Sequence, residues 1–441
     1  MRTSRRRFLC GLAASLPIAG FPAIVKLRSP NSLLSHACIG VANMGMADLS
    51  GLKACRDLHI AALCDVDPTF LAAAKKLCPD ARTYLNAREM FEKEGRRIDS
   101  VNVSTPDHTH ARYVIDALNR GLNVYAQKPL CRSVADCRRI EALVIEKRAV
   151  TQMGTQVAAW ECDRQTVAFL KSGRIGAVKR VWIFSNRGGQ TTANHDWPIP
   201  ESPIPKGLDW KEWLGDAPYR PFSKGAYHPV AWRKWRDFGT SWLGDLGLHL
   251  LNPIWVGMNL GKRGPISVEA ESPLEPEPIR AQFWPRMSHI VWHMPGIKAS
   301  GGKPFDIEWC DGNLARPKIT AKTDRIYLPP ENFRELFARS PLGAQPMEGR
   351  VVEGEDGFLL SSHYGRSPVV VMKKGGIIPP PNVGPAPSHW RDYVDGCVQG
   401  SRTASSFEWT GRLTEMVILG NMAMVNPGVN MRWDAEHGIR T

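Results

Sequence analysis

The sequence has 441 residues, of which 43% are hydrophobic and 23% are charged, and this composition excludes a disordered chain. Its length exceeds that of one ordinary core, so two domains are expected. The formal net charge of +14 raises the question of nucleic-acid binding. Because the basic residues are spread along the chain and form neither a zinc-finger spacing nor a basic helix, we predict no nucleic-acid partner.

Residues 1–30 form a candidate export signal. The basic start MRTSRRR precedes an apolar stretch that ends at Val25, which is the pattern of a signal peptide. The segment SRRRFLC resembles the twin-arginine signal, with Arg5 and Arg6 as its pair and Cys10 in place of the usual lysine. We therefore expect the twin-arginine translocase as a partner and a periplasmic or otherwise exported location, with a membrane tether if the signal stays uncleaved. The competing interpretation is a chance basic start before a membrane anchor.

A glycine-rich turn follows the first apolar strand pattern after this segment. In ACIGVANMGMADL, the three positions of the pattern G-x-G-x-x-G are Gly40, Ala42 and Gly45. The first glycine allows a tight turn, and a small second residue lets a pyrophosphate approach the N-terminus of the next helix. Ala42 departs from glycine and narrows that approach. We predict a dinucleotide site at this turn, with Asn43 and Met44 among its contacts.

The next strand pattern, HIAALCDVD, contains Asp65, which lies twenty residues after Gly45. A carboxylate at this place can accept hydrogen bonds from ribose hydroxyls and would repel a 2′-phosphate. NAD is therefore favoured over NADP. The alternative is an aspartate that only ends a strand.

Strand and helix patterns alternate up to about residue 155. Helices are expected at 69–79 and 107–121, and strands at 97–106 and 122–130. This alternation predicts a parallel, doubly wound sheet, in which ligands lie beyond the carboxyl ends of the strands. Ser104, Thr105 and Lys128 follow such ends. Later segments favour strands at 178–186, 288–294, 305–310 and 367–374, and proline-rich loops at 196–205 and 375–389.

The segment LGDLGLHLL places Asp245 and His249 four positions apart, on one face of an expected helix. Histidine can exchange a proton near neutral pH, and a neighbouring carboxylate can fix its tautomer and favour the imidazolium. Two other interpretations remain. The pair could be a structural ion pair or helix cap, or it could be half of a metal site completed by His195 or His228.

Taken together, these segments resemble the Gfo/Idh/MocA family, which includes glucose–fructose oxidoreductase and inositol dehydrogenase, over about residues 36–436. The matching segments are Gly40–Gly45, Asp65, STPDHTH at 104–110, QKP at 127–129, GTQ at 154–156, DFGTSWLGDLGLHLL at 237–251 and EWTGRLTEMVILGN at 408–421. The resemblance implies an α/β protein with a Rossmann domain at 35–155. It also implies a second α/β domain at 156–436, whose open, mostly antiparallel sheet serves substrate binding and oligomerisation.

The resemblance also implies site residues. Lys128 of QKP, Asp245 and His249 correspond to the catalytic group that faces the nicotinamide, and no metal is expected. The motifs STPDHTH and GTQ add His108 and Gln156 to the expected cofactor contacts. One departure is Gln127, because the family has glutamate before this lysine.

Aromatic and basic side chains crowd the segment AYHPVAWRKWRDFGTSW before Asp245. Sugars stack their C–H faces on aromatic rings and bind their hydroxyls to polar groups. We therefore predict substrate contacts at Tyr227, His228, Trp232 and Arg233. The alternative is that the aromatic residues belong to an ordinary core.

The combined prediction is an exported oxidoreductase, a dimer or tetramer, that transfers hydride between tightly bound NAD and a sugar, polyol or glycoside. One alternative is a redox-neutral NAD-dependent glycosidase or epimerase that uses the same site. Another is a non-catalytic carbohydrate-binding protein, for which Ala42 and Gln127 would be signs of lost activity.

Overall fold

The computed structural model describes residues 33–190, 196–312, 322–363 and 365–440. The candidate export signal at residues 1–30 lies outside these ranges. Within them, no helix combines the length and apolarity needed to cross a membrane.

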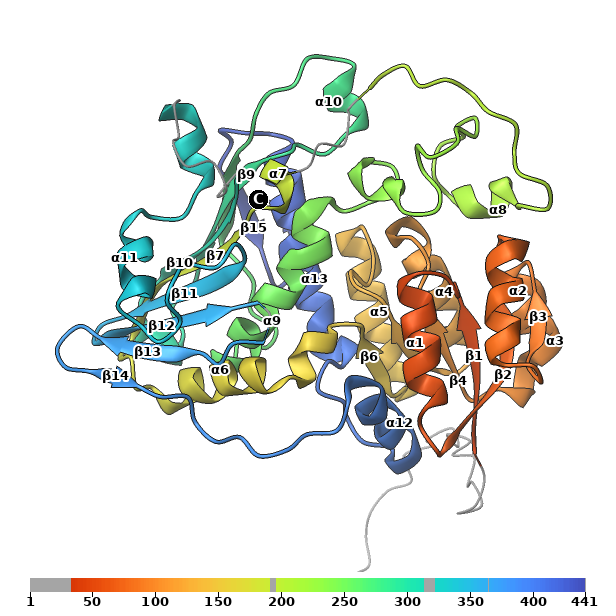
Figure 1. Cartoon of the computed structure of the whole chain (residues 1–441), viewed down its shortest axis with the longest axis horizontal. Helices are drawn as coiled ribbons and strands as arrows, with labels where there is room; N and C mark the ends of the chain where they lie inside the picture. Colours follow the sequence, from red (N-terminus) through yellow and green to blue (C-terminus); the bar gives the residue numbers. More distant parts are fainter. Residues whose placement is uncertain (1–32, 191–195, 313–321, 364, 441) are drawn as a thin grey trace, which may run out of the picture. The chain divides into compact units, whose positions relative to one another are not determined.

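The N-terminal part is a six-stranded parallel sheet with the strand order β3-β2-β1-β4-β5-β6 (Figure 1). Its strands are β1 (Leu34–Ile39), β2 (Leu58–Cys64), β3 (Arg82–Tyr84), β4 (Ser100–Val103), β5 (Asn123–Ala126) and β6 (Thr151–Met153). The connecting helices are α1 (Met44–Lys53), α2 (Pro68–Leu77), α3 (Ala87–Glu94), α4 (Asp107–Asn119) and α5 (Val134–Lys147). The chain order reverses between β1 and β4, which is where such sheets bind dinucleotides. The predicted doubly wound Rossmann sheet is confirmed.

The C-terminal part contains a ten-stranded sheet with the order β14-β13-β12-β11-β7-β10-β9-β8-β15-β16. These strands are β7 (Val178–Ser185), β8 (Ser267–Glu271), β9 (Ser288–Met294), β10 (Phe305–Asp311), β11 (Gly349–Gly354), β12 (Gly357–Ser362), β13 (Val369–Met372), β14 (Ile377–Ile378), β15 (Met431–Asp434) and β16 (Ile439–Arg440). β7 and β10 pair in parallel, and the other described pairings within this second sheet are antiparallel. The predicted mostly antiparallel sheet is confirmed.

Helices of the C-terminal part pack on this sheet and on the Rossmann helices. They are α6 (Glu161–Ser172), α7 (Arg187–Gln190), α8 (Trp210–Leu214), α9 (Leu248–Gly257), α10 (Ile279–Gln282), α11 (Asn332–Ala338), α12 (His389–Gln399) and α13 (Phe407–Met424). In Figure 1, α13 lies between the two sheets, where it contacts α5 on one side and β8 and β9 on the other. One continuous apolar core therefore joins the two parts, and it includes Val101, Leu413 and Trp292.

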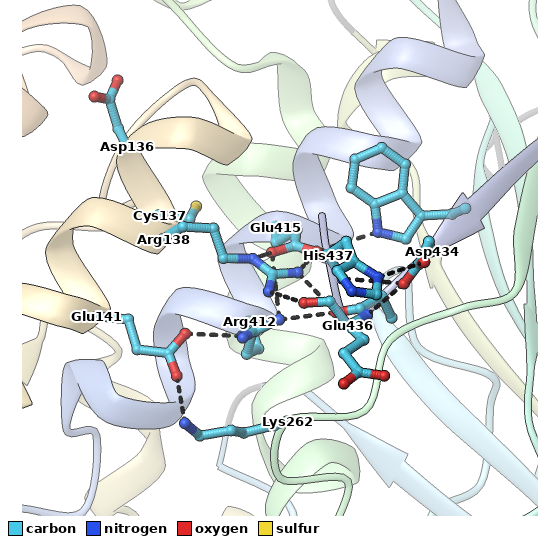
Figure 2. Close-up of polar contacts among 12 residues, drawn as sticks. Asp136, Cys137, Arg138, Glu141, Lys262, Arg412, Glu415, Asp434, Glu436 and His437 are labelled. Carbon is cyan, nitrogen blue, oxygen red and sulfur yellow. Dashed lines mark hydrogen bonds and ion pairs between the residues drawn. The ribbon is translucent and has the colours of Figure 1, made fainter. Parts of the chain in front are cut away.

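A buried polar cluster fixes α13 against α5, and Figure 2 shows its side chains. Arg138 on α5 donates to both carboxylate oxygens of Glu415 on α13, at 2.6 and 2.7 Å. Arg412 on α13 donates to Glu141 at 2.8 Å, and Lys262 contacts the same carboxylate at 2.9 Å. Two-pronged arginine–carboxylate pairs specify orientation as well as distance. These pairs therefore hold α5 and α13 in one relative orientation.

Candidate functional site

The turn between β1 and α1 requires glycine at two positions. Gly40 has a φ of +79°, and a methyl group on it would lie 2.6 Å from the carbonyl oxygen of Ser104. A methyl group on Gly45 would lie 2.2 Å from the carbonyl oxygen of Gly40. The chain thus closes tightly around the N-terminus of α1, where the positive end of the helix dipole favours an anion.

A single cleft runs past this turn. The predicted cofactor residues that line it are Gly40, Ala42, Asn43, Met44, Asp65, Ser104, Thr105 and Lys128. Trp213, His228, Trp232 and Arg233 from the C-terminal part line the same cleft. Gly45 is not among the lining residues and packs against the backbone of Gly40. The structure therefore brings most of the predicted cofactor residues together with three of the four predicted substrate residues.

Asp65 follows β2 and presents its carboxylate to this cleft. One oxygen accepts a hydrogen bond from the N–H of Val41 at 2.9 Å, and the other accepts one from the N–H of Asp67 at 3.0 Å. Burial raises the pKa of Asp65, while these two donors act to lower it. The two hydrogen bonds fix the carboxylate at the end of β2, beside the glycine turn.

Two predicted cofactor residues lie behind the cleft rather than on its wall. The Nε2 atom of His108 is 2.7 Å from the carbonyl oxygen of Trp213, and burial lowers the pKa of this histidine to about 3. Gln156 donates from its Nε2 atom to the hydroxyl of Tyr125 at 3.1 Å. Both side chains support residues nearer the cleft, and their contact with a cofactor stays a prediction.

His110 joins the two loops that carry Thr105 and Lys128. Its Nδ1 atom is 2.6 Å from the carbonyl oxygen of Pro129, and its Nε2 atom is 2.7 Å from that of Thr105. Carbonyl oxygens only accept, so both contacts are hydrogen bonds at once only when the ring carries two protons. His110 lies in the STPDHTH motif, so the sequence pointed to this residue. Its contacts with the two loops become visible only in the folded chain.

Asp48 on α1 is a buried carboxylate that the sequence did not single out. It accepts hydrogen bonds from Gln127 Nε2 at 2.8 Å, Ser104 Oγ at 2.8 Å, Tyr125 Oη at 3.1 Å and Trp390 Nε1 at 3.0 Å. Burial raises the pKa of Asp48, and the four donors oppose this rise. A carboxylate thus touches position 127 from the neighbouring helix, although the side chain at 127 is itself an uncharged amide.

Replacing Gln127 with glutamate is expected to destabilise the protein by roughly 3 kcal/mol, because two carboxylates would then meet in a buried site. The matched variant Asp48→Asn/Gln127→Glu exchanges the carboxylate and the amide between the two positions. Position 48 can then donate and position 127 accept, so this variant should recover more than half of the lost stability. Thermal unfolding of the three proteins measures the difference. A Gln127→Glu protein as stable as the wild type would show that the amide–carboxylate contact does not matter.

Lys128 meets Asp245 across the two parts of the chain. Its Nζ atom lies 2.8 Å from Asp245 Oδ1. Arg233 Nε contacts the same oxygen at 3.2 Å, and Arg187 Nη1 contacts Oδ2 at 3.2 Å. Burial acts to raise the pKa of Asp245, but the three cations hold it well below the usual aspartate range. Asp245 is therefore a permanent anion that orients its neighbours and does not exchange a proton.

The helix around Asp245 is not a regular α-helix. Residues Leu243–Gly247 form a π-helical turn, and α9 begins at Leu248. This wider turn directs Asp245 to the three cations, and no hydrogen bond joins it to His249. Burial, followed by the charges of Lys128 and His363, lowers the pKa of His249 far below its ordinary value. The prediction that Asp245 favours an imidazolium at 249 is therefore wrong, because burial outweighs the carboxylate and keeps the ring neutral.

Further groups near this pair come from strand ends that are far apart in the sequence. Arg187 follows β7, and its Nε atom contacts Glu348 at 2.6 Å. His363 follows β12, and its ring centroid lies 5.6 Å from that of His249. Arg350 on β11 contacts the backbone carbonyl of His249 at 3.4 Å. None of these residues belongs to a local motif, so the sequence alone could not identify them.

The structure places the four predicted substrate residues in three different environments. Trp232 and Arg233 lie at the cleft, where the guanidinium of Arg233 stacks 4.4 Å from the Trp232 ring. Tyr227 is buried in an aromatic cluster, with its ring 4.8 Å from that of Trp235. His228 lines the cleft, but its Nε2 atom is 2.9 Å from Asp67 Oδ2.

Asp67 lies two residues beyond Asp65, so His228 reaches the cofactor side of the cleft and not Asp245. This placement gives no support to a metal site shared by Asp245 and His228. His195, the other third ligand considered for that site, lies outside the described residues.

Comparison with known proteins gives independent evidence. A model of the oxidoreductase family with an NAD-binding Rossmann fold matches residues 34–155, and the model of the C-terminal α/β domain of the same family matches residues 178–289. Together these stretches exceed half of the chain. Inositol 2-dehydrogenase of Gluconacetobacter diazotrophicus is 31% identical over 150 residues, which is 33% of this chain and 43% of that protein. The chain thus aligns with less than half the length of such relatives.

Solved structures agree in fold over almost the whole chain. GenD2 from gentamicin A biosynthesis, solved in complex with NAD, has a TM-score of 0.60 at 15% identity, and the match covers 95% of this chain and all of that one. Aldose–aldose oxidoreductase from Caulobacter crescentus has a TM-score of 0.58 at 14% identity, covering 91% and 99% of the two chains. At such identities these similarities establish the fold.

Proposed function

Since this chain belongs to the Gfo/Idh/MocA family of oxidoreductases, we propose that it is an exported NAD-dependent enzyme that transfers hydride to or from a sugar, polyol or glycoside. The observation that carries the proposal is the 2.8 Å contact between Lys128 and Asp245. Lys128 also lines the cleft beside the glycine turn, whereas Asp245 and His249 are not among the residues that line it. Lys128 is therefore the link between the catalytic group and the nucleotide-binding turn.

The cleft fits a dinucleotide. The Gly40–Gly45 turn and the N-terminus of α1 would hold the pyrophosphate, and Asp65 would accept hydrogen bonds from the adenosine ribose. The missing Cβ atoms at Gly40 and Gly45 let this turn pack against the backbone of Ser104 and close on itself. NAD, when bound there, would supply a hydride acceptor at its nicotinamide ring. The charge of Asp65 favours NAD over NADP.

Two side chains outside the glycine turn would transfer the proton of the substrate hydroxyl. Lys128 and the neutral His249 are the groups that can take a proton from a substrate hydroxyl or return one. The Nδ1 atom of His249 is buried and has no hydrogen-bond partner among the described residues. Asp245, which stays ionised, fixes the position of Lys128.

The location and assembly belong to the same proposal. The twin-arginine pattern with Arg5 and Arg6 supports export of a folded protein. Free NAD is scarce outside the cytoplasm, so an exported enzyme is expected to hold its cofactor tightly. The open C-terminal sheet offers a surface for a dimer or tetramer.

The test begins with the full chain purified from its own host or a close relative. Protein denatured by heat should release close to one NAD(H) per chain, and added NADH should bind more tightly than NADPH. Asp65→Ser should narrow that preference. The holoenzyme should show a change in absorbance at 340 nm with at least one member of a panel of sugars and polyols. Absence of bound nucleotide together with absence of NADH binding would overturn the proposal, and so would the absence of any change in absorbance at 340 nm across the whole panel.

A further inference from the structure

We propose, on the basis of the hydride-transfer function above, that the substrate is a sugar that carries a carboxylate, and that Arg233 binds this group. Three cationic side chains surround the carboxylate of Asp245. Lys128, Arg187 and Arg233 all contact this one carboxylate. A second carboxylate, Glu348, contacts Arg187 at 2.6 Å. Three cations therefore share two anions.

Neither the neighbouring histidines nor Asp107 forms an ion pair with Arg233, whose ion pair among the described residues is with Asp245. Burial lowers the pKa of His363 to about 3 and lowers that of His249 far below its ordinary value, so both rings are neutral at pH 7. Asp107 also lines the cleft, but its buried carboxylate bonds to Thr240 and forms no ion pair with a described residue. Burial raises the pKa of Asp107, and the charges of His110, Lys128 and Arg233 act to lower it.

Arg233 is held in a geometry suited to a carboxylate. Trp232 covers one face of the guanidinium at 4.4 Å, and the Nε atom is fixed by Asp245 at 3.2 Å. The Nη1 atom is 3.4 Å from the carbonyl oxygen of Val230, and Nη2 has no hydrogen bond to a described residue. The side chain is 32% exposed, so the outer edge of the guanidinium remains accessible. A planar guanidinium with a free edge binds the two oxygens of a carboxylate in parallel.

The cofactor does not account for this arginine. The N-terminus of α1, beside Gly40 and Gly45, would hold the pyrophosphate. Arg233 lies instead with Lys128 and Asp245, at the groups that carry the proton. A substrate carboxylate bound by Arg233 would therefore hold the sugar next to Lys128.

The experiment compares methyl β-D-glucuronide with methyl β-D-glucoside, which differ in the carboxylate. Binding to the NADH-loaded protein is measured by the fluorescence of the bound NADH, which does not require turnover. The glucuronide should bind roughly tenfold tighter or better than the glucoside, because charge-assisted pairs add binding energy. Arg233→Gln should abolish this preference, and Arg233→Lys should recover part of it. Arg88→Gln changes the net charge equally at an exposed position of α3 and should have no effect.

Each result decides the inference. Equal affinity of the wild-type protein for the two glycosides would overturn it, as would a preference that survives Arg233→Gln. A loss of NADH affinity in Arg233→Gln without a change in the preference would assign the arginine to the cofactor and also overturn it. The proposed function fails separately, when no sugar changes the absorbance at 340 nm although the glucuronide binds selectively.

Discussion

Replacement of Lys128 by methionine is expected to lower kcat/KM by about 10²–10⁴-fold, the range found when a positioned acid–base group is removed. NADH affinity should change little, because the glycine turn and Asp65 hold the other end of the cofactor. The reason for the loss is that Lys128 lines the cleft and contacts Asp245 directly. Arg233 does both as well, but its guanidinium does not exchange a proton. Steady-state kinetics and NADH titration measure the two effects separately.

Two further variants distinguish loss of proton exchange at position 128 from loss of its charge and from the removal of any lysine. Lys128→Arg keeps the positive charge beside Asp245 but cannot release a proton near neutral pH, so it should remain nearly inactive. Lys76→Met removes an exposed lysine from α2 and should be fully active. Normal turnover in Lys128→Arg would show that the lysine acts only through its charge, and normal turnover in Lys128→Met would remove it from the mechanism.

Replacement of Gly45 by alanine is expected to weaken NADH binding roughly ten- to a hundredfold, the equivalent of about 1–3 kcal/mol of overpacking. The added methyl group would lie 2.2 Å from the carbonyl oxygen of Gly40, and this neighbour is backbone, so the turn itself must open. Isothermal titration with NADH measures the change.

The control is Gly376→Ala. A methyl group at Gly376 meets nothing within 4 Å, and its backbone has no left-handed conformation. This variant should bind NADH as the wild type does. If Gly45→Ala also binds NADH normally, the cofactor does not rest on this turn, and the assignment of the cleft is wrong.

The sequence predicted the fold well where local patterns repeat. Apolar strands separated by helices identified the Rossmann part, and the strand patterns at 178–186 and 305–310 became the parallel pair β7 and β10 at the centre of the second sheet. Their pairing could not be read from the sequence, because it depends on contacts between residues more than a hundred positions apart. The π-helical turn at Leu243–Gly247 was missed as well. An apolar segment that contains D-x-x-x-H is as compatible with an ordinary α-helix as with a π-helical turn.

The site was predicted in part. The residues that lie in motifs, such as Gly40, Asp65 and Lys128, line one cleft as expected. Asp48 was missed because a single aspartate in a helix has no local signature, and only the fold brings it to Gln127. The sequence could not show that Tyr227 belongs to a buried aromatic cluster and not to the cleft, because an aromatic side chain suits a sugar site and an apolar cluster equally well.

The central claim is that the nicotinamide lies between the Lys128 loop and the helix that carries Asp245 and His249. A crystal structure of the protein grown with NADH tests it most directly. The account predicts density for the pyrophosphate at Gly40–Gly45 and for the nicotinamide ring beside Lys128, with its reactive carbon open toward His249. NADH bound in another pocket, or in this cleft with the nicotinamide directed away from Lys128, would contradict it.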